Sequence, residues 1–499
     1  MTSATYGDGG GTSQYLTFGG GISYGSSWSA PMISGGIALM AQAFPNHTPE
    51  QLVDRVLASA NNKFFTPDGN TTFTTHGASI QHGYDDVFGH GIPDFYAALS
   101  PITTSSNPFS FGGGGGSGGG GSGGGGGSIP FSSLKKYPVS QTLFVPSNSM
   151  GNAISNGLNN KYTYAYDALN GGFKLYLSDF IHEENLENQK IKISLKNEID
   201  KLSNFDDNTN IYENIFKGEF FNIKNKYDYG SSITLDAPNL AIQNITPKNN
   251  FYINPFLSEN NGLGFNQKLY ISGNDLFLSY NNSKLNPLTN INKEIILPIE
   301  TFAASLNINN NLFEKFSVTA GILKEDKSFL LSKSSGAFEI ENQNITNFYG
   351  INLSKNFNKN SILSFNNTIG FSSFNNNNNN FVLGSSDVLS TSFEIDYELS
   401  NIFGKDKFNF TLSQPNKVEK GEMNFRLIGL SNKNGIIPFQ DYKINLSPSG
   451  RQKDLTISYY RSFYKNFRLG FKSIVTDHRG HIRNNDLNAD FLLMSSISF

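Results

Sequence analysis

The chain has 499 residues, with 38 Lys and Arg against 41 Asp and Glu, so its formal net charge is −3. This balance excludes a nucleic-acid binder that depends on bulk positive charge. The absence of cysteine excludes a disulfide framework, a thiolate metal site and a cysteine nucleophile. Abundant Gly and Phe beside a 16% charged fraction disfavour a helical cytosolic enzyme, and the length predicts two or three domains.

The net charge differs between the two parts of the chain. Residues 1–130 hold two basic and seven acidic side chains, a net charge of −5, whereas the remainder carries +2. No apolar run approaches the roughly 18 to 20 residues that a membrane helix needs. Met1 is followed by Thr, Ser and Gly rather than by a basic and then an apolar region, so we expect no export signal at this start.

A Gly-rich segment lies between the two parts. Residues 112–128 contain 14 Gly and 3 Ser, a composition that cannot bury a core and predicts a flexible coil. The sequence leaves open whether this segment is natural or an engineered linker. We assign residues 106–130 to a Gly/Ser-rich linker that separates two units.

An apolar helix is predicted directly after Gly25–Pro31, which reads GSSWSAP. Gly35 and Gly36 lie in its middle, where each glycine weakens a helix by about 1 kcal/mol, so close packing against a neighbour is expected. Ser27 would lie at the helix N-terminus, where free amides and the helix dipole favour negative charge. That position suits a nucleophile, although GSS before a helix also reads as a simple capping turn.

A second helix has an explicit start. Thr48 as N-cap, Pro49 at the first helical position and Gln51 form a capping box before LVDRVLASA. Its predicted apolar face consists of Leu52, Val53, Val56 and Leu57. The segment GHGIPDFYAAL follows from Gly89.

Taken in order, these motifs resemble the subtilisin-like serine peptidases, over residues 1–105. The resemblance implies that Ser27 is the catalytic nucleophile, with Ser26 and Trp28 departing from the usual residues. It also implies that the catalytic Asp and His precede the serine. The 26 residues before Ser27 contain no histidine and only Asp8 as a carboxylate, so we expect this chain alone to be inactive.

The histidines after Ser27 offer no evident substitute. His76, His82 and His90 lie near Asp85 and Asp86, but their spacing lacks a zinc or calcium signature, so we predict no metal site and no cofactor. A serine-carboxyl peptidase shares the serine motif, but the segment after Ser27 fits the subtilisin pattern better.

Residues 131–229 have a mixed character and are assigned to a passenger tail and pore-helix region. KYTYAYDAL and GGFKLYL, around Asp167, read as strands. NQKIKISLKNEIDKL places Leu195, Ile199 and Leu202 on one helical face. This segment is either an ordinary surface helix or a helix that lies inside a pore.

The last half alternates with period two. Phe393, Ile395 and Tyr397 alternate with charged residues, and similar runs continue to the terminal Phe499. A soluble sandwich and a membrane barrel both show this pattern. The polarity of the second face, strands of about ten residues and long Asn-rich loops favour the barrel. A chain that ends inside a strand also suits a closed barrel.

This half resembles the translocator barrel of autotransporters that carry subtilisin-like passengers. FTLSQPNKVEKGEMNF from Phe410 and LSPSGRQKDLTISYYRSF from Leu446 are similar to their strand-turn-strand and final hairpin segments. The resemblance implies twelve strands over residues 230–499. It also implies that the outer-membrane insertion machinery reads Phe499.

The predicted fold is therefore an α/β subtilisin-like fragment followed by a mainly β transmembrane barrel. We expect a Gram-negative outer-membrane autotransporter that displays a serine endopeptidase passenger at the cell surface or outside the cell. Its expected partners are protein or peptide substrates, outer-membrane lipid and the barrel insertion machinery, and no nucleic acid. The alternative is a non-enzymatic surface-displayed protein with a decayed peptidase remnant.

Overall fold

The computed structural model describes residues 26–74, 80–112, 128–130, 135–182, 221–224, 230–234, 262–285, 297–376, 380–434, 436–464, 467–483 and 487–497. The chain forms two compact units. Unit 1 comprises Met1–Ser140, Tyr162–Leu175 and Leu427–Gln440. Unit 2 comprises Gln141–Lys161, Tyr176–Arg426 and Asp441–Phe499. The domain boundaries predicted near residues 105, 130 and 229 stay predictions.

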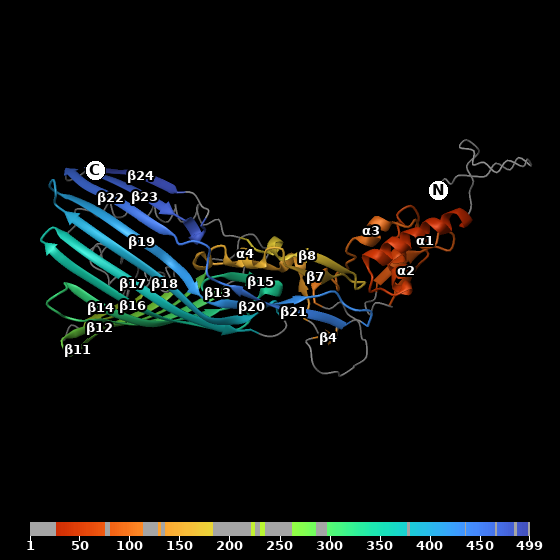
Figure 1. Cartoon of the computed structure of the whole chain (residues 1–499), viewed down its shortest axis with the longest axis horizontal. Coiled ribbons are helices and arrows are strands. Elements are labelled where there is room, and N and C mark those ends of the chain that lie inside the picture. Colours follow the sequence, from red (N-terminus) through yellow and green to blue (C-terminus); the bar gives the residue numbers. More distant parts are fainter. Residues whose placement is uncertain are drawn as a thin grey trace, which may run out of the picture. The chain divides into compact units, whose positions relative to one another are not determined.

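Unit 1 contains the helices α1 (Ser26–Ala43), α2 (Pro49–Ala58) and α3 (Phe95–Leu99), drawn in red and orange in Figure 1. Their shared core consists of Met40, Phe44, Leu52, Val56 and Ala98. A Cβ at Gly36 would lie 2.0 Å from the Phe95 ring, whereas Gly35 has open space around it. The close packing predicted for the glycine pair is therefore confirmed at Gly36 alone.

The start of α2 follows its prediction. Thr48 Oγ1 accepts a hydrogen bond from Gln51 N at 3.2 Å, and Gln51 Oε1 accepts one from Thr48 N at 3.0 Å, which confirms the capping box. On the predicted apolar face Leu52 and Val56 are buried, but Val53 is 40% exposed. Arg55 is fully buried beside them.

Two small sheets complete unit 1. The strands β1 (Gly69–Phe73) and β2 (Ile80–Tyr84) form an antiparallel hairpin. A four-stranded sheet has the order β5-β3-β7-β8, with β5 (Tyr137–Pro138), β3 (Ser110–Phe111), β7 (Tyr162–Tyr166) and β8 (Gly172–Tyr176). The two strands expected around Asp167 are thus confirmed as β7 and β8.

Strand pairing joins the chain before the Gly-rich segment to the chain after it. Its residues 113–127 lie outside the described part, but β3 before it pairs antiparallel with β5 after it. The strand β4 (Ser128–Pro130) pairs with the first residues of β21 (Ile436–Asn445). Chain on both sides of the Gly-rich segment therefore belongs to unit 1.

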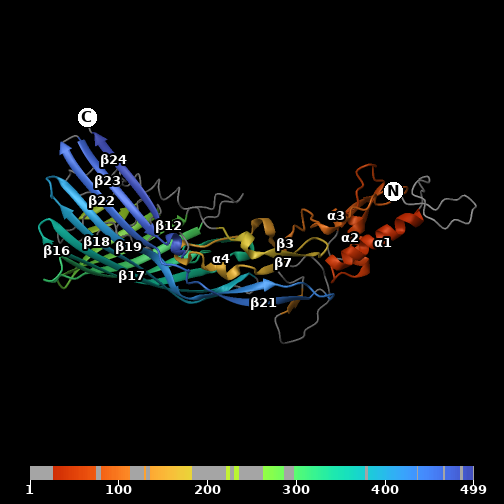
Figure 2. The same cartoon turned by 45° about the horizontal axis from the view of Figure 1, so that its top comes forward.

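Unit 2 is built on one large antiparallel sheet, seen from two directions in Figures 1 and 2. Its main path runs through β9 (Phe221–Lys224), β10 (Gly230–Thr234), β11 (Gly262–Ile271), β12 (Asn274–Leu285), β13 (Leu297–Asn307), β14 (Lys315–Asp326), β16 (Gln343–Asn358), β17 (Ser361–Asn375), β18 (Val382–Ser400), β19 (Asp406–Lys420), β22 (Lys453–Tyr464), β23 (Phe467–Asp477) and β24 (Asn488–Ile497). Twelve of these strands begin at residue 230 or later, the number that was expected. Among the described residues β9 and β24 are not paired, so a closed barrel is not confirmed.

The two ends of this sheet differ. Short connections such as residues 272–273 and 359–360 lie at what we call the turn end. Longer connections, including residues 327–342, 421–452 and 478–487, lie at the loop end. They contain the strands β15 (Lys333–Ser335) and β20 (Glu422–Ile428) and the 3₁₀ turns η5 (Gly336–Phe338) and η6 (Arg479–His481).

Short elements between residues 139 and 180 lie in unit 2 or, for the first turn, at its boundary with unit 1. They are the strand β6 (Leu143–Val145), the helix α4 (Ala153–Leu158) and the turns η2 (Val139–Gln141), η3 (Asn148–Met150) and η4 (Leu177–Phe180). A Cβ at Gly157 of α4 would lie 2.2 Å from Ile444, so this helix packs closely against β21. The helix expected over residues 188–202 lies outside the described residues. Within the described ranges, no helix combines the length and apolarity that crossing a membrane requires.

Candidate functional site

The predicted nucleophile lies in the first turn of α1. The helix begins at Ser26, so the backbone of Ser27 occupies the position that was expected. Amides of a first helical turn have no partner within the helix, and the helix dipole favours negative charge there. The Ser27 side chain is outside the described part of the structure, and its catalytic role stays a prediction.

The described histidines that follow Ser27 within the subtilisin-like region contact other groups of that region or of unit 1. His47 Nε2 lies 3.1 Å from Leu169 O. His82 Nε2 lies 2.9 Å from Ala60 O, and its Nδ1 lies 3.3 Å from Nδ1 of His90. Burial, followed by the charge of His82, lowers the pKa of His90. His76 lies outside the described residues, and among those described no three His, Asp or Glu side chains are grouped as a metal site would require.

A buried ion pair organises unit 1. Arg55 Nη2 lies 2.6 Å from Asp167 Oδ2, and both side chains are fully inaccessible to solvent. The same guanidinium donates from Nε to Ala98 O at 2.6 Å and from Nη2 to Ser100 O at 2.9 Å. It also lies over the Phe44 ring, 4.1 Å from the ring centroid. The pair thus connects α2 to the end of α3 and to the segment after β7.

Both oxygens of the Asp167 carboxylate accept hydrogen bonds from backbone amides. Its Oδ2 accepts from Ile102 N at 2.9 Å, and its Oδ1 accepts from Leu169 N and Gly171 N at 3.0 and 2.8 Å. Sequence reasoning noted Asp167 only as a marker between two strands. The burial of Arg55 could have been predicted, because position 55 falls on the same helical face as Leu52 and Val56.

Replacing one partner of this pair leaves an uncompensated buried charge. We therefore expect Arg55→Met to destabilise unit 1 by about 3 to 5 kcal/mol, and Arg55→Met/Asp167→Leu to recover most of that loss. Proteolysis of the full chain in increasing urea measures this, with exposed Asp86→Asn as the control. Equal urea midpoints for Arg55→Met and the wild type would contradict the assignment.

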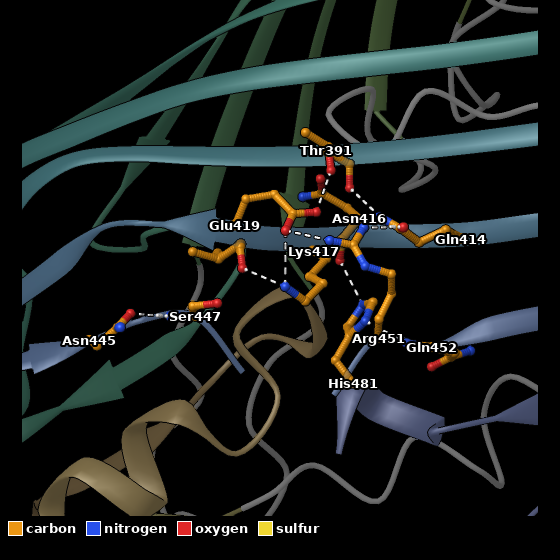
Figure 3. A network of polar contacts seen from close by, with 11 residues as sticks. Thr391, Gln414, Asn416, Lys417, Glu419, Asn445, Ser447, Arg451, Gln452 and His481 are labelled. Atoms are coloured by element: carbon orange, nitrogen blue, oxygen red, sulfur yellow. Dashed lines mark hydrogen bonds and ion pairs between the residues drawn. The ribbon is translucent and has the colours of Figure 1, made fainter. Parts of the chain in front are cut away.

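A second polar cluster lies at the loop end of the large sheet, on the segment FTLSQPNKVEKGEMNF (Figure 3). Glu419 Oε2 accepts hydrogen bonds from Lys417 Nζ at 3.1 Å and from Arg451 Nη2 at 2.6 Å. Its Oε1 accepts one from Thr391 Oγ1 at 2.7 Å. Arg451 also donates to Gln414 Oε1. The cluster joins β18, β19 and the connection that leads into β22.

His481 of η6 closes the cluster from the other side. Its Nδ1 accepts a hydrogen bond from Gln452 N at 3.0 Å, so Nε2 carries the proton and donates to Asn416 O at 3.1 Å. Burial lowers the pKa of His481 to about 4. The two sequence motifs on which the autotransporter resemblance depended thus meet here. Charged and amide groups satisfy one another, so the cluster fixes the connections between hairpins.

The pKa of His481 predicts a dependence on pH. Between pH 6.5 and 4 the unfolded chain binds the proton and the folded chain does not, so stability is full above pH 6.5 and falls as pH drops. The loss is about 1.4 kcal/mol per pH unit, or about 3 kcal/mol over the interval. Asparagine tolerates the backbone φ of 60° at this position, so His481→Asn removes the titrating imidazole without straining the backbone.

Unfolding midpoints measured at pH 7 and pH 4.5 test this. The wild type should lose more stability on acidification than His481→Asn does. Identical losses in the two proteins would show that His481 does not carry the effect.

Comparison with known proteins found a family match for one region of the chain. Residues 9–91 match the subtilase family. Helices α1 and α2, the β1–β2 hairpin and Ser27 lie in this range, so the match supports the predicted subtilisin-like region. No curated protein and no solved structure matches the chain. The autotransporter resemblance of the strand-rich part stays a prediction.

Proposed function

We propose that the protein is an outer-membrane autotransporter, in which the large sheet closes into a lipid-facing barrel and the subtilisin-like region is the passenger. One observation carries the proposal, and it is the inverted polarity of the sheet. On β17, Phe365 and Phe371 are exposed, whereas Asn366, Thr368 and Ser372 are buried. A water-soluble sheet has the opposite arrangement, with its apolar face covered and its polar face wet.

The inversion extends over many strands. Exposed large apolar or aromatic side chains of the sheet include Phe302, Val318, Ile322, Ile345, Tyr349, Ile351, Phe365, Phe371, Ile395, Phe410, Phe471, Phe491 and Leu493. Buried polar side chains include Thr301, Ser305, Ser317, Thr319, Thr346, Asn352, Ser354, Ser364, Asn366, Thr368, Ser372, Ser390, Ser392, Asp396, Glu398 and Ser473. Apolar-out and polar-in alternation is the pattern of a transmembrane barrel.

The geometry of the sheet supports the same proposal. Lipid offers no hydrogen bonds to an open sheet edge, so a sheet in a membrane has to pair its first strand with its last. All neighbouring strands on the main path are antiparallel, with short connections at one end and long ones at the other. The barrel would present its loop end to the cell exterior.

The subtilase match supports a serine endopeptidase as passenger. In the complete reaction Ser27 would attack a peptide carbonyl after an upstream His had taken its proton, and substrates would be surface or extracellular proteins. A non-enzymatic displayed scaffold is the alternative. It is favoured by one observation, that His47, His82 and His90 all contact groups of their own region.

The membrane proposal predicts a severe effect for a lysine on the outer face. Phe365 pairs with Leu353 and Ile395 on the neighbouring strands, within the apolar surface. Phe365→Lys should cost about 2 to 4 kcal/mol in lipid, and abolish or strongly reduce the heat-modifiable band in detergent gels. Phe365→Leu should leave that band unchanged. On a water-facing sheet the lysine would be tolerated within about 0.5 kcal/mol, and an unchanged Phe365→Lys band would contradict the proposal.

The peptidase proposal predicts that the 499-residue chain does not react by itself. Without a base, the serine hydroxyl is a weak nucleophile, so a fluorophosphonate probe should give no labelling that Ser27→Ala removes. Labelling is read by in-gel fluorescence, with a commercial subtilisin as the positive control. Ser27-dependent labelling of this chain would mean that a base within it activates the serine.

A further inference from the structure

The connection between β14 and β16 is folded around a buried carboxylate. Glu325 is fully buried and accepts hydrogen bonds from Ser328 Oγ at 2.8 Å, Leu330 N at 2.9 Å and Leu331 N at 2.6 Å. Leu330 and Leu331 have φ angles of 50° and 65°, which bulky residues rarely adopt. The carboxylate therefore holds residues 328–331 in a conformation that the two leucines alone disfavour.

This connection holds a strand from a distant part of the chain. β15 pairs antiparallel with β6, so that Ser335 lies opposite Leu143 and Ser334 opposite Phe144. Ser335 Oγ donates to Gln141 O at 2.8 Å, and Thr142 Oγ1 accepts from Ala337 N at 3.2 Å. A Cβ at Gly336 would lie 2.4 Å from Thr142 Oγ1. Gly336 therefore permits the close approach of the two segments.

An aromatic pocket receives one side chain of the added strand. Phe144 is fully buried, and its ring centroid lies 5.8 Å from that of Phe338. Phe338 in turn contacts Phe381 at 5.5 Å and Phe425 at 6.4 Å. Phe381 N donates to Ala337 O at 2.8 Å, which ties the pocket wall to the same connection. Three hairpin connections of the loop end thus build one apolar pocket. The buried face of the strands of the large sheet is polar by contrast.

We propose that residues 327–342 form a strand-acceptor site that captures residues 141–145 after they have reached the loop end, and so fixes the passenger tail there. Backbone pairing supplies the binding energy, while Thr142 and Phe144 set the register, because a slip of one residue would turn Phe144 out of its pocket. Glu325 orders the acceptor beforehand, so little conformational entropy is lost on capture. This inference rests on the proposed function.

The test uses the full chain expressed in the outer membrane of a Gram-negative host. Two measurements are taken: heat-modifiable migration, which reports the barrel, and the fraction of residues 26–112 that protease added to intact cells can cleave, which reports display. Phe144→Ala and Glu325→Gln should keep the heat-modifiable band and reduce the displayed fraction about fivefold or more, since each shifts the captured population.

Matched controls separate capture from general damage. Phe403→Ala removes a phenylalanine that is 69% exposed at the turn end, and Glu398→Gln removes a buried sheet carboxylate that pairs with Lys407 at 2.9 Å. Both should display the passenger at the wild-type level. Because the sequence lacks cysteine, Leu143→Cys with Ser335→Cys can form one disulfide between opposite residues. That bond should restore display to Glu325→Gln, and a reductant should remove the rescue.

The outcomes separate the inference from the proposed function. A wild-type chain that is neither heat-modifiable nor displayed would overturn both. A wild-type chain with both properties, whose display Phe144→Ala and Glu325→Gln leave unchanged, would overturn the acceptor site alone. Loss of display in the two variants, with the rescue by the disulfide, is the result that we expect.

Discussion

The burial of polar side chains on one face of the sheet is the constraint on which the rest of the molecule depends. Ser, Thr and Asn positions of β16 and β17 face inward, and some bond to one another, as Thr346 and Ser372 do at 2.7 Å, while Phe365 and Phe371 face outward. Such a sheet cannot lie in water at little cost, because its exposed face would be a continuous apolar surface. The alternation gives the sheet one polar and one apolar face, and in the proposed barrel the polar face would line the interior.

Unit 1 is assembled from three separated segments, and polar side chains with several partners join them. Arg55 and Asp167 connect the subtilase-like helices to the chain beyond the Gly-rich segment. Tyr166 Oη donates to Gly429 O at 2.8 Å and accepts from Ser431 N at 2.7 Å, which connects that chain to residues 427–440. Each bond is made by a buried group whose other partners are also fixed. The subtilase-like region therefore shares one folded unit with residues 162–175 and 427–440.

Local features of the fold could be predicted from the sequence, and non-local ones could not. The capping box of α2 and the alternation of β18 and β19 involve neighbours in sequence, so the pattern is visible there. The number of strands came from a family resemblance. Which face of the strands is exposed does not follow from a period of two. Arg55 with Asp167, and Glu325 with residues 327–342, are set by contacts that no periodicity records, and α4 is too short to give a helical pattern.

Backbone strain is concentrated where these buried polar groups lie. Most positive φ angles elsewhere fall on residues that tolerate them, such as Asn160, Asn170 and Asn401. At the loop end they fall on Lys327, Leu330, Leu331, His478 and His481, and of these Leu330, Leu331 and His481 each have a buried polar contact that stabilises them. Strain of this kind persists only where the surroundings over-determine the conformation. Buried polar contacts therefore hold these three residues of the loop end in one conformation, which suits the proposed acceptor site because that site has to be ordered before its strand arrives.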